Sequence, residues 1–329
     1  MKIGVYRPKE LPESFNVCID NIIRHFPRSD VDVVESSVPD ELSFSDLIWD
    51  PRAGGGHAPA DYLLSLKKPL VVTLHGIGPI LFPEHYSNGF LRRLKVIRNN
   101  FEKKKKWKKC KTNVAKVVTV SNFSKRVIHE ELGVPLDAID VIYNGVDTEI
   151  FECRSVDKPI EEPYFLHISN DESRKNVDRI IAAYSSLPQD SRWPLVLKLS
   201  SEREVNVPGV KLIRERLSEQ DIASLYKGAG AFLFPSIYEG FGIPIIEAMS
   251  TGCPVITSKN TACQEVAGGF ATLVSATSVS SISNAMKQLM QMQVDEKAIK
   301  NMHEHAKTFD WKVAANEYLK LFRSLLKLS

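Results

Sequence analysis

The chain has 329 residues, of which 43% are hydrophobic and 25% are charged, a composition typical of globular proteins and long enough for two domains. No segment approaches the ~18 consecutive apolar residues of a membrane-spanning helix, and the opening MKIGVYRPKE becomes charged too early for a signal peptide. The five cysteines include no CxxC pair, so we expect neither a disulfide framework nor a zinc site. These features favour a protein of the reducing cytoplasm.

The positive charge is concentrated in one segment, residues 91–111. It has eleven Lys or Arg and one acidic residue, a local charge of +10, so the rest of a chain with net charge +3 carries −7. Leu91, Leu94, Ile97 and Phe101 recur at near-helical spacing among these cations. The predicted patch for an anionic membrane surface or an acceptor consists of Arg92, Arg93, Lys95, Arg98, Lys103, Lys104, Lys105, Lys106, Trp107, Lys108 and Lys109.

Three interpretations of this segment remain open. A helix with ring and aliphatic groups among its cations can lie on an anionic bilayer, which would make the protein peripheral on the inner face of a membrane. A solvated charged helix or a mobile loop explains the composition equally well. Nucleic-acid binding has the weakest support, because the segment contains no known binding motif.

Apolar runs alternate with helical periodicity through the first half of the chain. Strands are predicted at residues 2–6, 31–36, 46–49, 70–74, 117–120 and 140–143, and helices at 15–26 and 121–132. This alternation indicates a parallel sheet covered by helices on both faces.

The pattern lapses between Phe151 and Pro163, where FECRSVDKPIEEP is polar and contains proline, so we interpret this stretch as a linker. The alternation then restarts, with strands predicted at 164–169, 195–200, 210–213, 231–236, 254–258 and 271–274. Helices are predicted at 176–187, at 218–226 and toward the C-terminus. Two α/β halves joined by a short linker suggest a ligand cleft between them.

The stretch YEGFGIPIIEAMSTGCPVITS, residues 238–258, has the features of a ligand-binding turn. Residues 239–242 follow a buried strand, Pro244 suits the first turn of a helix, and Gly252 suits its C-terminal cap. A loop that joins the carboxyl end of a parallel strand to a helix N-terminus is a preferred place for phosphate.

Two carboxylates flank this turn. Glu239 lies in the loop, and we expect Glu247 in the first turn of the helix. Carboxylates bind vicinal sugar hydroxyls well, so the pair can hold the two sugars of a nucleotide-sugar with the diphosphate between them. The alternative is a helix N-terminus that merely favours acidic residues, and the residues alone do not decide between the two.

This stretch resembles the signature of family 4 of the retaining glycosyltransferases, in which two glutamates separated by seven residues precede Ala-Met and a Gly-x-Pro-Val-Ile strand. Other segments resemble family motifs in the same order. They are TVSNFSKRVI at 119–128, VIYNGVDTEIF at 141–151, ESRKN at 172–176, LSEQDIASLYKGAGAFLFPS at 217–236 and FDW at 309–311. The resemblance covers most of residues 69–329.

The resemblance implies the GT-B fold, an α/β architecture of two Rossmann-like domains whose parallel sheets face each other across a cleft. We accordingly expect an acceptor-side domain at 1–152, a nucleotide-sugar domain at 163–310 and a final helix, 311–329, that crosses back to the first domain. The implied activity is retaining, metal-independent transfer of a hexose from GDP-mannose or a UDP-sugar to a glycan or lipid-linked acceptor, with no other cofactor.

Matched position by position, the family pattern also assigns roles to residues. Glu247 would bind the nucleotide ribose and Glu239 the donor-sugar hydroxyls. The catalytic set would be completed by two cations that compensate the leaving diphosphate and by a histidine of the first domain that faces the donor, namely Arg174, Lys175 and His75. The remaining donor contacts would come from the loop residues Gly240, Phe241 and Gly242.

The chain also departs from the family pattern. YRPKELPESF follows the first strand in place of a glycine-rich loop, and Ser169 stands where a glycine is usual. Two other interpretations therefore stay open. One is a different GT-B enzyme, a nucleotide-sugar epimerase or hydrolase, and the other is a catalytically inactive protein that binds a membrane or nucleic acid.

Overall fold

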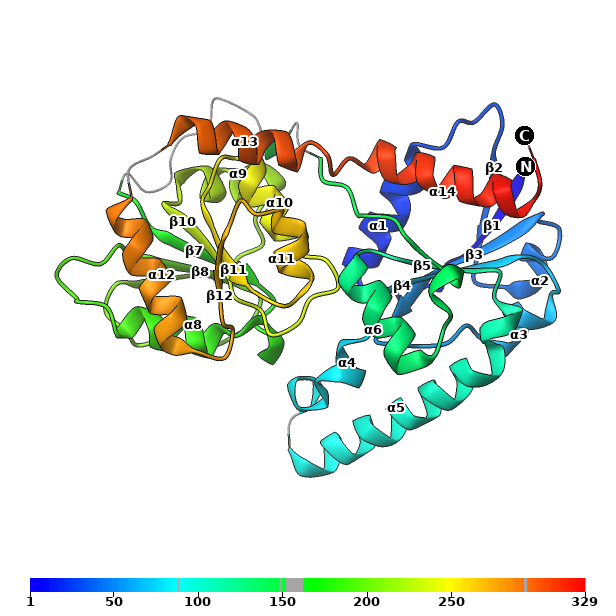
Figure 1. The fold of residues 1–329 in the computed structure, drawn as a ribbon, viewed down its shortest axis with the longest axis horizontal. Helices are drawn as coiled ribbons and strands as arrows, with labels where there is room; N and C mark the ends of the chain where they lie inside the picture. The colour runs from blue at the N-terminus through cyan, green and yellow to red at the C-terminus, as the bar shows by residue number, and fades with distance from the viewer. Residues whose placement is uncertain (88, 148–149, 152–161, 293–294, 329) are drawn as a thin grey trace. The chain divides into compact units, whose positions relative to one another are not determined.

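The structure is a computed structural model that describes residues 1–87, 89–147, 150–151, 162–292 and 295–328. It divides into two compact units, which Figure 1 shows in ribbon form. The first unit comprises Met1–Gly145 and Asp310–Ser329, and the second comprises Val146–Phe309. Residues 152–161 of the predicted linker lie outside the described residues.

Within its described residues, the first unit contains a sheet of six parallel strands in the order β2-β1-β3-β4-β5-β6. All six strands were predicted, because each contains an apolar run of the length that a buried parallel strand needs. Their bounds are β1 Lys2–Tyr6, β2 Asp32–Ser36, β3 Leu47–Gly54, β4 Leu70–Gly76, β5 Lys116–Thr119 and β6 Ile139–Val141.

Two strands of the first unit are longer than predicted. Strand β3 continues through Asp50 to Gly54, although we expected residues 50–52 to lie outside it. Its pairing with β4 shifts register between Asp50 and Ala53, which accommodates Pro51. Strand β4 includes His75, which we expected just after the strand.

Helices cover the sheet of the first unit (Figure 1). Helix α6 is capped at its start by Ser121, whose hydroxyl accepts a hydrogen bond from the Ser124 N–H, and at its end by Gly133 in the left-handed conformation. The four- and five-residue helices α2, α3 and α4 are too short to show periodicity and were not predicted. The bounds are α1 Glu13–Arg24, α2 Pro39–Leu42, α3 Asp61–Ser65, α4 Gly78–Leu81, η1 Pro83–Tyr86, α5 Phe90–Cys110, η2 Lys111–Asn113, α6 Asn122–Leu132, η3 Leu136–Ala138 and α14 Trp311–Leu325.

The last helix, α14, belongs to the core of the first unit. Its Tyr318 hydroxyl lies 2.9 Å from Thr73 Oγ1, which also accepts a hydrogen bond from Trp49 Nε1 at 2.9 Å. At its start, a Cβ added to Gly145 would come within 2.1 Å of the Trp311 backbone nitrogen. Glycine at 145 therefore permits the contact that brings the C-terminal segment onto this sheet.

The described part of the second unit has its own sheet of six parallel strands, in the order β12-β11-β10-β7-β8-β9. Counted from β7, this is the 3-2-1-4-5-6 order of a dinucleotide-binding Rossmann sheet. All six strands had been predicted from their apolar runs. Their bounds are β7 Phe165–Ser169, β8 Leu195–Leu199, β9 Val210–Ile213, β10 Ala231–Phe234, β11 Val255–Ser258 and β12 Thr272–Val274.

In the described part of the second unit, four helices begin after a residue whose side chain caps them, namely Ser218, Thr261, Ser278 and Asp295. Helix α9 opens with a reciprocal capping box, in which Ser218 accepts from the Asp221 N–H and Asp221 accepts from the Ser218 N–H. The bounds are η4 Ser173–Lys175, α8 Val177–Ser185, α9 Glu219–Gly228, α10 Ile243–Ser250, α11 Ala262–Ala267, α12 Val279–Gln291 and α13 Glu296–Ala306.

Candidate functional site

The candidate site lies at the switch point of the second sheet. Strands β7 and β10 are neighbours, with Phe165 opposite Ala231, and the chain leaves them toward opposite edges of the sheet. Because the two connections diverge, the loops at the carboxyl ends of β7 and β10 border a crevice, and open α/β sheets bind ligands in such a crevice. The loop after β7 contains Arg174 and Lys175, and the loop after β10 contains Glu239.

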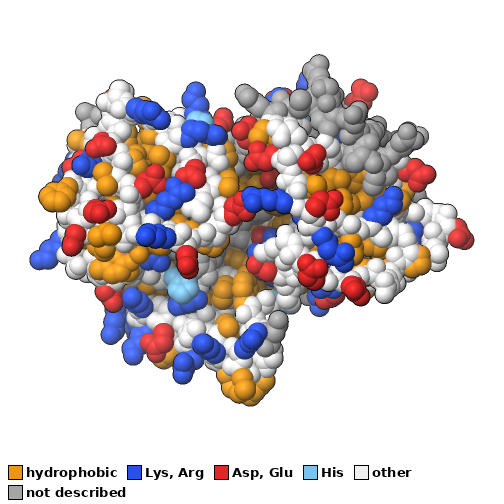
Figure 2. Space-filling model, turned by 180° about the vertical axis from the view of Figure 1, so that it is seen from behind, with side chains coloured by type: hydrophobic (Ala, Val, Ile, Leu, Met, Phe, Trp, Pro, Cys, Tyr) orange, Lys and Arg blue, Asp and Glu red, His pale blue; other side chains and the backbone are white. Residues whose placement is uncertain are grey.

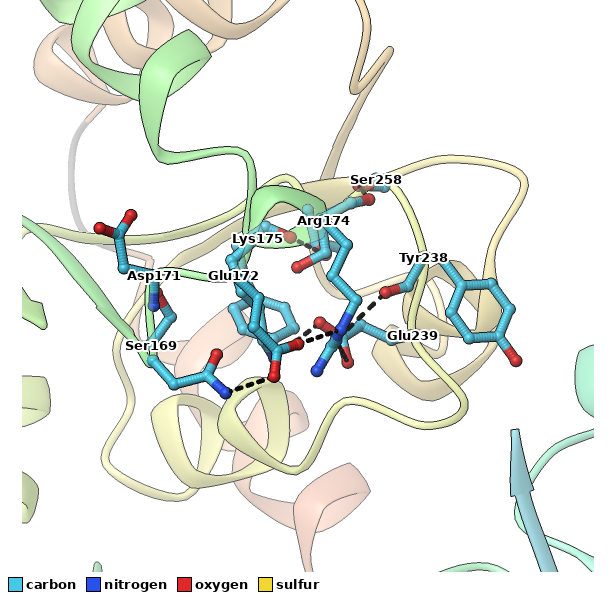
Figure 3. A network of polar contacts seen from close by, with 12 residues as sticks. Ser169, Asp171, Glu172, Arg174, Lys175, Tyr238, Glu239 and Ser258 are labelled. Atoms are coloured by element: carbon cyan, nitrogen blue, oxygen red, sulfur yellow. Dashed lines mark hydrogen bonds and ion pairs between the residues drawn. The ribbon is translucent and has the colours of Figure 1, made fainter. Parts of the chain in front are cut away.

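Glu239 joins the two loops through a pair of short ion pairs (Figure 3). Its Oε2 accepts from Arg174 Nη1 at 2.8 Å, and its Oε1 accepts from Lys175 Nζ at 2.8 Å. The residue is only 8% exposed. Burial by itself raises the pKa of the carboxyl, but Lys175 and Arg174 outweigh it, so the pKa lies below its usual value. Glu239 is thus an ionised group held between two cations.

Neighbouring groups fix the two cations in place. Arg174 Nε donates to Glu172 Oε2 at 2.7 Å, and the Arg174 carbonyl accepts from the Ile237 N–H at 2.8 Å. The Lys175 ammonium lies 4.9 Å from the centre of the Phe234 ring, a cation–π contact. Two preorganised cations at a switch point are suited to an anionic oxygen, of a carboxylate as here or of a phosphate.

Asn176 ties the loop after β7 to the rest of the sheet edge. It adopts a left-handed conformation, with φ of 68°, directly after the two cations. Its Nδ2 donates to the Pro235 carbonyl at 2.8 Å and to the Ala276 carbonyl at 2.7 Å. The turn that presents Arg174 and Lys175 is therefore anchored to the loop that presents Glu239.

Glu247 lies in a different environment on helix α10. The helix begins at Ile243, so Glu247 is in its second turn, and the prediction of a first-turn position was wrong. The Tyr226 hydroxyl donates to Glu247 Oε2 at 3.0 Å. Burial, with a smaller contribution from Glu219, raises the pKa of Glu247 to about 7, although the Tyr226 hydrogen bond opposes the shift.

The residues between the two glutamates shape the turn. Gly242 caps α10 with φ of 119°, a conformation that side-chain-bearing residues rarely adopt. The Phe241 side chain is buried, and its ring centroid lies 5.6 Å from that of Phe309, so this side chain packs in the interior. Gly240 precedes them in the same loop and is partly buried. The loop thus places backbone beside the N-terminus of α10.

His75 is a residue of the first unit. Its Nε2 lies 2.8 Å from the Pro51 carbonyl, which only accepts, so Nε2 carries the ring proton. The ring stacks on Phe15 at 4.7 Å, and burial lowers the pKa of His75 to about 4. The imidazole is therefore neutral near physiological pH, and the imidazolium form that would act as a general acid is scarcely populated.

Several contacts of the site were not predicted from the sequence. His167, buried in β7, has Nδ1 2.7 Å from the Leu233 carbonyl and Nε2 2.9 Å from Ser169 Oγ. The same Ser169 hydroxyl accepts from the Asp171 N–H at 3.2 Å, so the serine that replaces the usual glycine has structural partners. Asp171 in turn accepts from Arg203 Nε at 2.8 Å. A histidine inside an otherwise apolar strand was the one available signal.

One residue of the predicted surface patch is in the core. The indole of Trp107 is fully buried, and its Nε1 donates to the Gly56 carbonyl at 3.1 Å. The expectation that Trp107 lies at a membrane or acceptor surface was wrong, because its ring fills the space between α5 and the sheet. Across the described part of the chain, no three His, Cys, Asp or Glu side chains group as a metal site would require.

Comparison with family models decides which family the chain represents. The model "Glycosyl transferases group 1" matches residues 151–309, and the model "Glycosyltransferase Family 4" matches residues 45–150. This chain belongs to the family 4 glycosyltransferases. The predicted resemblance is thereby confirmed. The first matched region contains the three residues of the ion-pair cluster, Arg174, Lys175 and Glu239.

Curated relatives of this glycosyltransferase include three bacterial mannosyltransferases. O-antigen chain mannosyltransferase B of Escherichia coli is 28% identical over 291 residues, which cover 82% of this chain and 74% of the relative. The MMP alpha-(1->4)-mannosyltransferase of Mycolicibacterium hassiacum is 30% identical, covering 63% of this chain and 53% of the relative. The O-antigen chain mannosyltransferase RfbU of Salmonella typhimurium is 28% identical, covering 70% of this chain and 64% of the relative.

Solved structures confirm the fold of this glycosyltransferase. A glycosyltransferase from Rickettsia africae ESF-5 superposes with a TM-score of 0.75 at 15% identity, covering 100% of this chain and 99% of the other. Alr3699/HepE of Anabaena, in complex with UDP, superposes with a TM-score of 0.74 at 18% identity, covering 98% and 99%. The chain therefore has the GT-B architecture, with a Rossmann-like parallel sheet in each unit.

Proposed function

We propose that this glycosyltransferase moves a hexose, with mannose favoured, from a nucleotide-sugar to a hydroxyl of a glycan or lipid-linked acceptor, with retention at the anomeric carbon. The observation that carries the proposal is the ion-pair cluster of Glu239 with Arg174 and Lys175 at the switch point of a Rossmann sheet. The names of the mannosyltransferase relatives support the sugar. The UDP complex of the Anabaena protein supports a nucleotide donor.

In the proposed complex, the donor diphosphate binds Arg174 and Lys175 beside the N-terminus of α10. An incoming phosphate replaces the Glu239 carboxylate as partner of at least one cation, since both anions use the same donor atoms. Glu247, in the second turn of α10, accepts hydrogen bonds from the ribose hydroxyls. Two fixed cations supply the charge that a metal ion would otherwise bring, so transfer proceeds without one.

The proposed chemistry is a front-face displacement. The acceptor oxygen attacks the anomeric carbon from the side on which the diphosphate leaves, and the electrons of the broken carbon–oxygen bond go to the phosphate. The acceptor proton passes to that same phosphate oxygen, so no side chain has to act as a covalent nucleophile. Catalysis then comes from orientation and from the stabilisation of the leaving diphosphate by Arg174 and Lys175.

Glu239 and His75 have supporting roles in this scheme. Glu239 holds the cations before the donor arrives, and its carboxylate then becomes available to a donor-sugar hydroxyl. His75, whose proton is on Nε2, offers the lone pair of Nδ1 to a hydroxyl as a neutral hydrogen-bond acceptor. Neither residue is required to change its charge during the reaction.

Product analysis tests this function. The protein is incubated with GDP-mannose and with UDP-sugars, in the presence and absence of a glycan or lipid-linked acceptor, and NMR reports the anomeric configuration of the product. We expect acceptor-dependent transfer with retention, undiminished by EDTA. Free sugar or an epimer formed at the full rate without acceptor would contradict the proposal and favour hydrolysis or epimerisation.

A further inference from the structure

Helix α5 of the first unit has an inward face that accounts for its attachment to the sheet. Asn100, Trp107 and Cys110 are its buried residues. Asn100 Nδ2 donates to the Pro79 carbonyl, Trp107 Nε1 donates to the Gly56 carbonyl, and Lys103 Nζ donates to the Gly55 carbonyl. These contacts fix the helix along one side and leave its opposite side directed to solvent.

The outward face of α5 is apolar in its first three turns. Phe90 is 74% exposed, Leu94 47%, Ile97 47% and Phe101 66%. Their spacing of four, three and four residues places all of them on one side of the helix, and Leu91, 80% exposed, lies at the edge of the same face. Such a contiguous group of large apolar side chains on a surface indicates an interaction site.

Cations surround this apolar stripe. Three of them form ion pairs with carboxylates of the same unit. The nitrogen–oxygen distances are 3.9 Å for Arg93 with Glu84, 2.6 Å for Lys104 with Glu131 and 3.3 Å for Lys106 with Asp61. Figure 2 shows Lys and Arg side chains gathered over α5, at the lower edge of the view, beside hydrophobic ones. Among the described residues, Lys103 donates to a backbone carbonyl, and the other cations of α5 without an acidic side chain within ion-pair distance are Arg92, Lys95, Arg98, Lys105, Lys108 and Lys109.

A cationic hollow opens beside the stripe. Its volume is about 660 Å³, and four lysines, two acidic residues and three other residues line it: Lys103, Lys105, Lys106, Lys109, Asp61, Glu102, His57, Ala58 and Asn99. Lys105 and Lys109 face the hollow without an acidic partner among the described residues, so it is suited to a phosphate group that approaches along the helix. The apolar stripe and the lysines of the hollow thus lie side by side on α5.

We infer that α5 docks the protein on an anionic lipid bilayer, with the apolar stripe at the boundary between headgroups and acyl chains and the unpaired cations on lipid phosphates. No described helix has the length and hydrophobicity to cross a membrane, so α5 lies on the surface. The inference extends beyond the proposed transfer reaction and is independent of which donor is used.

The chemistry of α5 favours a bilayer over two other occupants. A second copy of the chain would bring two strongly cationic helices together, which like-charge repulsion opposes. A nucleic acid would pair with the cations but would leave Leu91, Leu94 and Ile97 in water, because aliphatic side chains do not stack on bases as aromatic rings do. An anionic membrane satisfies the apolar stripe and the cations together.

Vesicle flotation of the full chain tests the charge requirement. We expect binding to phosphatidylcholine vesicles that contain phosphatidylglycerol and little binding to phosphatidylcholine alone. The triple variant Lys105→Gln, Lys108→Gln, Lys109→Gln should bind about 100-fold more weakly, because each cation near an anionic surface contributes about fivefold. A control with the same loss of charge elsewhere, in which Gln replaces Lys297, Lys300 and Lys312, should bind like wild type.

The apolar stripe is tested in the same assay. Leu94→Ser with Phe101→Ser should weaken vesicle binding at least about tenfold, since both side chains are largely exposed and their loss leaves the core intact. The matched control is Phe44→Ser with Val313→Ser, which removes exposed apolar groups outside α5. Circular dichroism confirms that each variant is folded.

Three results would overturn the inference. One is vesicle binding by the α5 variants that equals wild type. Another is a dimer in analytical ultracentrifugation that Leu94→Ser with Phe101→Ser abolishes, which would assign the stripe to a second copy. The third is oligonucleotide binding that survives loss of the stripe and outcompetes vesicles, which would assign the cations to nucleic acid. Donor turnover in detergent is measured in parallel and should be unchanged, so failure here is distinguishable from failure of the proposed reaction.

Discussion

Glu239 and Glu247 lie eight residues apart, the first buried and the second partly buried, yet their pKa values shift in opposite directions. Glu239 is held between Arg174 and Lys175, and these cations keep its pKa below the usual value. Glu247 has a neutral partner, the Tyr226 hydroxyl, and burial raises its pKa to about 7. The residue type is the same, so the environment alone makes the difference.

The two glutamates can therefore contribute differently to ligand binding, although they lie in one short segment of the chain. A carboxylate that stays ionised can position two cations for a diphosphate at any physiological pH. A carboxylate that titrates near neutrality takes up a hydrogen-bonding ligand at the cost of releasing its proton, so its ligand affinity depends on pH. The loop before α10 therefore provides fixed charge, and the second turn of α10 provides a group that responds to its partner.

Removing the cations should have the largest effect. We expect Lys175→Met and Arg174→Met each to lower kcat about 100- to 1,000-fold, because each variant loses a preorganised charge that stabilises the leaving diphosphate. Steady-state kinetics with the natural donor measure the loss. Lys287→Met, at an exposed position on α12, is the matched control and should leave kcat unchanged. A loss below about threefold in both site variants would contradict the role assigned to the cations.

Breaking the cluster from the other side should destabilise the protein. Glu239→Gln leaves two partly buried cations without their partner, and we expect a loss of about 3 kcal/mol in the free energy of unfolding at neutral pH. Because the folded-state pKa of Glu239 lies below its unfolded value of about 4.5, the wild-type advantage is present above that pH and is lost as the pH falls through the folded-state value. Denaturant unfolding across this range measures it.

The same variant also tests how Glu239 acts on function. Turnover should fall, whereas affinity for the nucleoside diphosphate should stay the same or rise, since the phosphate no longer competes with the carboxylate for Arg174 and Lys175. Weaker diphosphate binding in Glu239→Gln, at a temperature where the variant is fully folded, would show that the carboxylate itself contacts the nucleotide.

Glu247→Gln should have a smaller effect of opposite sign. The folded-state pKa of about 7 exceeds the unfolded value of about 4.5, so wild-type stability falls as the pH rises from 4.5 through 7. Gln keeps the hydrogen bond from Tyr226 and never ionises. We therefore expect it to stabilise the protein by about 2 kcal/mol at about pH 8 and by little at about pH 5. Thermal unfolding at the two pH values measures the difference.

Tyr226→Phe provides the companion to that experiment. Removing the hydroxyl that stabilises the carboxylate should move the pKa of Glu247 further upward, so the pH dependence shifts to more alkaline values. In Glu247→Gln the same Tyr226→Phe change should leave the pH dependence flat. An equal pH dependence of stability in wild type and Glu247→Gln would show that Glu247 does not titrate in this range.

The sequence predicted the strands of both sheets, because a buried parallel strand is recognisable as a continuous apolar run. Prediction was weaker where a residue's role depends on two faces of one element. In α5, the exposed stripe that includes Leu94 and Phe101 was visible from its spacing, but the abundance of lysine hid the inward face, and Trp107 was assigned to the wrong side. Helix α10 begins one residue after Gly242, which placed Glu247 a turn later than expected.

The site was predicted residue by residue but not contact by contact. The motif pointed to Glu239, Arg174 and Lys175, yet nothing local indicates that the carboxylate binds both cations, because the partners lie 64 and 65 positions apart. Only the adjacency of β7 and β10 brings them together. For the same reason, the bond between His167 and the Leu233 carbonyl could not be foreseen, since it joins those same two strands.

The central claim is that Arg174 and Lys175 bind the diphosphate of the donor. Isothermal titration calorimetry of matched nucleoside diphosphate and monophosphate, on wild type and on Lys175→Met, tests it most directly. We predict that wild type prefers the diphosphate by at least about tenfold, the value of one charge-assisted contact, and that Lys175→Met loses most of this preference. Equal affinity of wild type for both nucleotides, or a preference that survives in Lys175→Met and in Arg174→Met, would contradict the claim.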